Sequence, residues 1–266
     1  MRKNKKLMII ICVLAIMVIG SFGTLAYLTD VAGVTNTFTV GKVDITLDEA
    51  VVNEDGEPLG QDGKVVDSRE DAARKDGGTN GEDGNKYHLV PGQTYLKDPT
   101  VTVVKGSEES YVRTIMTIHN ASEMQKIIDA HKLGDYKAFL GDWDENIWKY
   151  IGYTEDKTAN TISFEFRYYK KVSGFDANGE ELKDNLVLEP LFTQLVVPDS
   201  LTGEELKALY DGGFKMVIEG HAIQVVGFED EKNADGSLKK SAEDVAWEAF
   251  SGQEKDAAKG ATVRNE

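Results

Sequence analysis

Short β-type runs separated by turn residues occupy most of this chain, and they constrain its fold more than any other feature. Alternating or β-branched apolar residues are typical of half-buried strands, and glycine, proline and asparagine between such runs mark turns. The runs cover residues 37–47, 100–105, 111–119, 147–153, 161–169, 186–197 and 214–228. Because Pro190 lies inside the sixth run, that run is either two short strands or an edge strand with a break.

Three short helical patterns lie between these runs. Apolar residues recur at helical spacing between residues 122 and 133. A capping box at residues 202–205 predicts a second helix that ends near Tyr210, and Ser241 is placed to cap a third that ends at Phe250. Strands and helices do not alternate as they do in parallel sheets. The sequence therefore predicts a mainly β fold: an antiparallel β-sandwich, jelly-roll-like, with about three short helices in the connections.

The N-terminus has the anatomy of a secretory signal peptide. Four basic residues precede an unbroken apolar run of 13 residues, which is short for a bilayer span. Thr24 and Ala26 form a small-x-small cleavage pattern, so cleavage after Ala26 makes Tyr27 the first residue of the mature chain. An uncleaved N-terminal anchor is the alternative interpretation. The prediction is a protein that is secreted to the extracellular matrix or the cell surface, with no membrane attachment after cleavage.

The sequence predicts that the chain has three parts. Residues 1–26 are the signal peptide, residues 27–250 form a single β-sandwich domain, and residues 251–266 are a polar, disordered tail. Within the domain, residues 52–86 are rich in Gly, Asp, Glu and Asn, which predicts an acidic surface insertion.

Charge and cysteine content exclude several classes of protein. The chain has 30 basic and 46 acidic residues, for a net charge of −16, whereas nucleic acids and anionic lipids are bound by basic surfaces. The only cysteine, Cys12, lies in the signal peptide. A disulfide framework and a cysteine zinc site are therefore excluded for the mature chain, which must be stabilised by its core, by metal ions or by polymerisation.

Catalytic motifs are missing from the sequence. The four histidines have no metal-binding spacing, and there is no nucleophile elbow, phosphate loop or dinucleotide fingerprint. We therefore expect a protein that is not an enzyme and has no cofactor. His131 falls on the inner side of a predicted helix, where a core or rim histidine is commoner than a ligand.

Two features leave alternatives open. Asp176, Asn178 and Glu180, and likewise Glu229, Glu231 and Asn233, are oxygen-rich enough for calcium, but ordinary turns explain them more simply. The tryptophans could line a sugar-binding face, but core positions explain them more simply. These are Trp143, Trp148 and Trp247.

The N-terminal third resembles the start of the TasA and camelysin family. The resemblance is carried by Gly23-Thr24-Leu25-Ala26-Tyr27-Leu28-Thr29-Asp30 and by Asn36-Thr37-Phe38-Thr39-Val40-Gly41-Lys42-Val43-Asp44-Ile45. It continues more loosely in Leu89-Val90-Pro91-Gly92, Lys97-Asp98-Pro99-Thr100-Val101 and Tyr111-Val112-Arg113. Members of this family are Gram-positive exported proteins that a dedicated SipW-type signal peptidase processes.

The resemblance implies a secreted jelly-roll domain. In fibre-forming members, the residues freed by signal cleavage become a strand donated to the next subunit, which is strand addition at an open sheet edge. Here the donor would lie within residues 27–39, with Tyr27, Val31, Val34 and Phe38 as candidate assembly residues. The alternative is that this segment pairs within its own subunit. The metallopeptidase label of some members is not carried over, because no zinc motif is present.

Three functions follow as hypotheses. The first is a structural subunit of a cell-surface or biofilm-matrix fibre, whose partners are further copies of itself and the signal peptidase. The second is a non-polymerising adhesion module, with a ligand site near Trp143 and Trp148. The third, and least favoured, is a secreted peptidase of the camelysin type.

Overall fold

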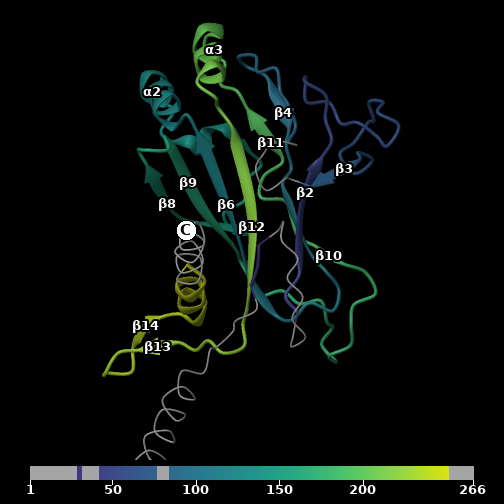
Figure 1. The fold of residues 1–266 in the computed structure, drawn as a ribbon, viewed down its shortest axis with the longest axis vertical. Helices are drawn as coiled ribbons and strands as arrows, with labels where there is room; N and C mark the ends of the chain where they lie inside the picture. Colours follow the sequence, from purple (N-terminus) through teal and green to yellow (C-terminus); the bar gives the residue numbers. More distant parts are fainter. Residues whose placement is uncertain (1–28, 32–41, 77–83, 252–266) are drawn as a thin grey trace, which may run out of the picture.

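A computed structural model describes residues 29–31, 42–76 and 84–251. The predicted fold class is confirmed: the protein is mainly β, with antiparallel sheets packed together and three short helices (Figure 1). The signal-cleavage residues Thr24, Ala26 and Tyr27 lie outside the described residues. So do the candidate assembly residues Val34 and Phe38 and the tail beyond residue 251.

The largest sheet has five antiparallel strands in the order β1-β12-β6-β9-β8. Its strands are β1 (Thr29–Val31), β12 (Met216–Gln224), β6 (Ser110–His119), β9 (Thr161–Tyr168) and β8 (Trp148–Asp156). The predicted hairpin of residues 147–169 is confirmed by the pairing of β8 with β9. The long run 214–228 forms a shorter strand than predicted, because a turn follows Val225 and Gly227 has a φ of 100°.

Smaller sheets complete the sandwich. One has the order β10-β5-β2-β3, another the order β4-β11-β7, and a short hairpin pairs β13 with β14. The strands are β10 (Leu186–Val187), β5 (Thr100–Val103), β2 (Ile45–Ala50), β3 (Arg74–Asp76), β4 (Thr94–Leu96), β11 (Gln194–Val196), β7 (Leu140–Gly141), β13 (Glu231–Lys232) and β14 (Leu238–Lys240). The run around Pro190 is thus two short strands, β10 and β11, as one of the two sequence interpretations proposed.

The core lies between the inner faces of the sheets. Alternate residues of each strand point inward, so β2 contributes Ile45 and Leu47, β5 contributes Val101 and Val103, and β9 contributes Phe166. A second, smaller cluster forms on the outer face of the five-stranded sheet, where residues 242–251 are helical. This helix corresponds to the one predicted up to Phe250.

Two helices lie at one end of the sandwich (Figure 1). They are α2 (Ala121–His131) and α3 (Gly203–Asp211), and a 3-10 turn, η1 (Tyr136–Phe139), follows α2. The predicted capping box is present, since the Thr202 hydroxyl accepts a hydrogen bond from the Glu205 amide and the Glu205 carboxylate reaches back to Thr202. His131 and Glu205 hydrogen-bond at 2.8 Å and join the two helices. This contact lowers the pKa of Glu205 to about 2.

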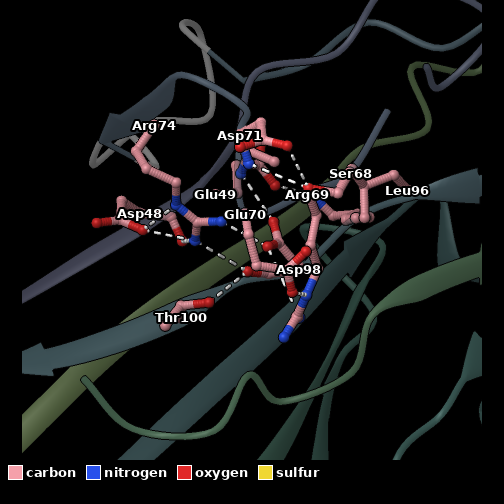
Figure 2. Close-up of polar contacts among 12 residues, drawn as sticks. Asp48, Glu49, Ser68, Arg69, Glu70, Asp71, Arg74, Leu96, Asp98 and Thr100 are labelled. Carbon is pink, nitrogen blue, oxygen red and sulfur yellow. Dashed lines mark hydrogen bonds and ion pairs between the residues drawn. The ribbon is translucent and has the colours of Figure 1, made fainter. Parts of the chain in front are cut away.

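The first part of the acidic insertion is tied to the sheet by a buried carboxylate. Asp98 accepts a hydrogen bond from the Ala50 amide at 2.7 Å and an ion pair from Arg74, which also contacts Asp48 (Figure 2). Arg69 lies 3.9 Å from the same carboxylate. Because Asp98 is only 1% exposed, these contacts are shielded from water. They hold residues 69–74 of the insertion against β2 and β5.

Candidate functional site

The N-terminal segment meets the five-stranded sheet at its edge. β1 pairs antiparallel with β12, and Thr29, Asp30 and Val31 lie opposite Ile223, Ala222 and His221. Of the candidate assembly residues, the structure therefore describes the backbone of Val31 and places it on β12 of its own chain. This is the within-subunit pairing that the sequence left open as an alternative.

The same edge of β12 continues past β1 toward Met216. The amides of His119 and Val225 bond to Lys215 and Glu109, so the odd-numbered residues of β12 direct their main-chain groups toward β6. The main-chain groups of the even-numbered residues point away from β6; these residues include Met216, Ile218 and Gly220. In the part of the chain that the structure describes, no strand pairs with them there. Such an edge can accept an added strand.

A groove of about 850 Å³ opens beside this part of β12. Met216, Ile218 and Phe214 form one wall, and Leu206 and Leu209 of α3 close one end. β2 and residues 84–89 form the opposite wall. At the other end the sheets come together, because Gly220 lies against Ile45, Leu47 and Val101. The groove is mainly apolar, which suits a ligand with apolar side chains.

A buried ion pair fixes the wall opposite β12. The Lys97 ammonium donates to the Glu49 carboxylate at 2.7 Å, and Asn85 donates to Glu49 and to the Ala50 carbonyl. Burial alone would raise the pKa of Glu49, but the Lys97 charge and hydrogen bond outweigh it, and the pKa lies below its usual value. Tyr87 donates to the Leu96 carbonyl, and burial raises its pKa. Residues 84–89 are thus held in place as a groove wall.

The lining of the groove carries charges of both signs. Lys86, Lys207 and Lys215 line it from three different segments, and Lys207 pairs with Asp211. Glu54 also lines it and is exposed, and Tyr210 is 80% exposed.

The opposite edge of the five-stranded sheet is protected. β8 contains a bulge between Tyr150 and Gly152, and Lys149, Glu155 and Asp156 are exposed along it. Bulges and charged side chains are the usual devices that stop edge-to-edge pairing. β12 is therefore the edge of this sheet that is better suited to pairing.

A second polar cluster lies beneath the C-terminal helix, next to the β1 end of the edge. The Arg113 guanidinium lies between the rings of Trp247 and Phe250, at 4.6 and 4.9 Å from their centroids. Its Nε donates to His221 Nδ1 at 3.2 Å, and the His221 ring stacks on Phe250. Burial, together with the Arg113 charge, lowers the pKa of His221 to about 3. His221 therefore stays neutral in the folded protein.

This histidine makes stability depend on pH. The unfolded chain takes up a proton on His221 below about pH 6.5, whereas the folded chain does so only near pH 3, so acid favours unfolding over that interval. We expect the free energy of unfolding to fall by about 2 kcal/mol between pH 7 and pH 5 through this residue. Urea unfolding at both pH values measures it. His221→Asn keeps an acceptor for Arg113 and should lose this part of the slope; an unchanged slope would contradict the assignment.

The tryptophans and the candidate calcium loops have structural roles. Trp148 and Trp247 are buried, and the Trp143 indole donates to the Trp148 carbonyl. Asp176 accepts hydrogen bonds from the amides of Asn178 and Glu180, as a turn residue does. Among the described side chains, no group of three or more His, Cys, Asp and Glu is placed to hold a metal ion. Nor does that part of the chain contain a helix long and apolar enough to cross a membrane.

Together the fold and the site define a class of protein. It is a mainly β, sandwich-like protein in which a short N-terminal strand pairs with β12 of the five-stranded sheet, and a mainly apolar groove lies beside β12. No known family, curated protein or solved structure matches the chain.

Proposed function

We propose that this chain is an exported structural protein, a subunit of a cell-surface or biofilm-matrix fibre that assembles by donating its N-terminal strand after signal cleavage. The observation that carries the proposal is the edge of β12. β1 pairs with residues 221–223, and among the described residues no strand pairs on that side of β12 with Met216, Ile218 or Gly220. Because β1 pairs through main-chain groups, the same segment of another copy can take its place in the same register.

Three properties of the sequence support this role. The signal peptide keeps the N-terminus in the membrane until cleavage after Ala26, so cleavage by a SipW-type peptidase acts as the assembly switch. The net charge keeps free subunits soluble and makes assembly sensitive to salt. The cysteine-free mature chain gains stability from polymerisation. In this proposal the sandwich has jelly-roll topology and the protein is not an enzyme.

One observation favours a second candidate, a non-polymerising adhesion module. The groove beside β12 would then hold an extended segment of a different protein with apolar side chains. Of the tryptophans, Trp148 and Trp247 are buried and Trp143 is half-buried, so only Trp143 could contribute to a ligand face.

Size-exclusion chromatography and negative-stain microscopy test the proposal. Protein that begins at Tyr27 is compared with the same protein carrying a blocking tag before Tyr27, and with a variant that lacks residues 27–34. We expect filaments from the free N-terminus alone. Monomers from all three, across protein concentration, salt and pH, would contradict the proposal and favour the adhesion module.

A disulfide scan distinguishes donation from pairing within the subunit. Extending the β1 register places Gly33 opposite Glu219, at a position where main-chain groups do not bond across the new pair and a disulfide fits. Cys12 is absent from protein that begins at Tyr27, so Gly33→Cys with Glu219→Cys supplies the only thiols. Oxidised filaments should give a ladder of covalent oligomers on a non-reducing gel, and the two single-cysteine variants should not. An internally bridged monomer would contradict donation.

A further inference from the structure

A lysine, a glutamate and an asparagine meet on the wall of the groove opposite β12. The Lys97 ammonium donates to Glu49 Oε2 at 2.7 Å, and Asn85 Nδ2 donates to Glu49 Oε1 at 3.1 Å. The Glu49 carboxylate thus holds the two nitrogens next to each other, one on each oxygen. Lys97 is 8% exposed and Glu49 is 5% exposed, so the contact between them is shielded from bulk water.

The sheet itself places Glu49 beside Lys97. β2 pairs antiparallel with β5, and beyond the last paired residues the Ala50 amide donates to Asp98 Oδ1 at 2.7 Å. Glu49 precedes Ala50 in the chain, and Lys97 precedes Asp98. The position of the two charged side chains is therefore set by the backbone of two paired segments.

The Asn85 side chain is held at both ends of its amide group. Besides its contact with Glu49, Nδ2 donates to the Ala50 carbonyl at 2.8 Å, and Oδ1 accepts from the Val52 amide at 3.2 Å. A donor on a carbonyl oxygen stabilises the negative charge that develops there when a nucleophile attacks the carbon. Asn85 Cγ is therefore presented as an electrophile close to an amine.

Glu49 can carry the protons that such an attack requires. Lysine is a nucleophile only as the neutral amine, and a carboxylate in hydrogen-bond contact can take its proton. Burial alone would raise the pKa of Glu49, and the Lys97 charge outweighs it, so the resting pair is ionic until the proton moves. A slow transfer is sufficient, because one reaction in each molecule completes the modification.

We propose that Lys97 and Asn85 become joined by an amide bond between their side chains, with Glu49 as the acid and base. Glu49 takes a proton from the ammonium, and the neutral Nζ attacks Asn85 Cγ. The Nζ–Cγ bond forms and the Cγ–Nδ2 bond breaks. Glu49 gives its proton to Nδ2 and takes another from Nζ, so that ammonia leaves and Glu49 ends protonated. Nothing is oxidised or reduced, and no co-reactant is needed.

The groove and the cysteine content fit this modification. All three residues line the groove, which gives ammonia a path to solvent. The reaction replaces two buried charges by neutral groups, which removes the cost of keeping them from water. Residues 42–251 contain no cysteine, and the bond would close the loop of residues 85–97 covalently without a disulfide. The inference goes beyond the proposed function and does not depend on it.

The mass of the intact protein tests the proposal. Protein that begins at Tyr27 should weigh about 17 Da less than its sequence requires, through the loss of one ammonia. Trypsin does not cleave after a lysine whose amine is an amide. Residues 76–86 and 87–105 should therefore appear as one linked species, and its fragmentation should place the bond between Asn85 and Lys97.

Three variants make the result specific. Lys97→Arg keeps the charge beside Glu49 but lacks the amine, and Glu49→Gln keeps both reacting side chains but lacks the proton carrier. Both should have the full sequence mass, and Lys97→Arg should lower the thermal midpoint by about 5 °C or more through loss of the closed loop. Lys86 lines the same groove but is exposed, so Lys86→Arg should still lose about 17 Da. Circular dichroism shows that each variant is folded.

Two results would overturn the proposal. One is the full sequence mass in the folded, unmodified protein. The other is a loss of about 17 Da that persists in Lys97→Arg, because an asparagine followed by glycine, as at Asn178, can lose ammonia by forming an imide. Neither result depends on whether filaments form, so this test and that of the fibre function are read separately.

Discussion

We expect Asp98→Ala to lower the free energy of unfolding by about 3–5 kcal/mol, because it leaves the Arg74 charge without its buried partner and the Ala50 amide without its acceptor. The substitution should also release residues 69–74 from the sheet. Urea unfolding measures the first effect. Limited trypsin digestion measures the second, as faster cleavage after Arg69 and Arg74.

Asp62 provides the matched control for this substitution. It pairs with Lys64 in an exposed turn of the same insertion, and such surface pairs contribute little. Asp62→Ala should leave both the free energy of unfolding and the digestion rate close to those of the unmodified protein. Equal effects of the two substitutions would show that Asp98 does not anchor the insertion.

The second large effect is expected at the C-terminal helix. Trp247→Ala removes the ring that covers Arg113 and leaves a cavity beside Phe250, so we expect a loss of about 3–5 kcal/mol in the free energy of unfolding. The helix itself should loosen, which hydrogen exchange of residues 242–251 would detect as lower protection.

Glu248 is the control on the same helix, since it pairs with Lys240 at the surface. Glu248→Ala should shift stability by about 0.5 kcal/mol or less. If Trp247→Ala were as mild as this control, the helix would contribute little to the fold, and Arg113 would have to be stabilised from the sheet alone, through His221 of β12 and Glu165 of β9.

Local signals in the sequence predicted most of the elements. The hairpin of β8 and β9, the capping box at Thr202 and the helical spacing in α2 each depend on residues close together in the chain, so short-range patterns are enough to find them. The break at Pro190 was visible for the same reason, because proline cannot donate to a ladder.

Long-range contacts were not visible in the same way. Asp98 gathers partners 24 and 48 residues away, and Arg113 bonds to a histidine 108 residues away. Composition placed the acidic insertion on the surface, and nothing local showed that Arg74 would tie it to Asp98. The groove likewise forms from α3, β12 and residues 84–89, which meet only in the folded protein. The resemblance gave the candidate donor residues, whereas the edge of β12 that is proposed to receive them was found only from the register of the sheet.

The bulge in β8 has a consequence for how an assembly would grow. In the proposed fibre β12 receives the strand and β8 is protected, so contacts between copies would join different surfaces and the filament would be polar. One tip would present β12 without a donated strand and the other an undonated N-terminal segment. The two tips should elongate at different rates, and a free peptide of residues 27–41 should block only the tip that presents β12.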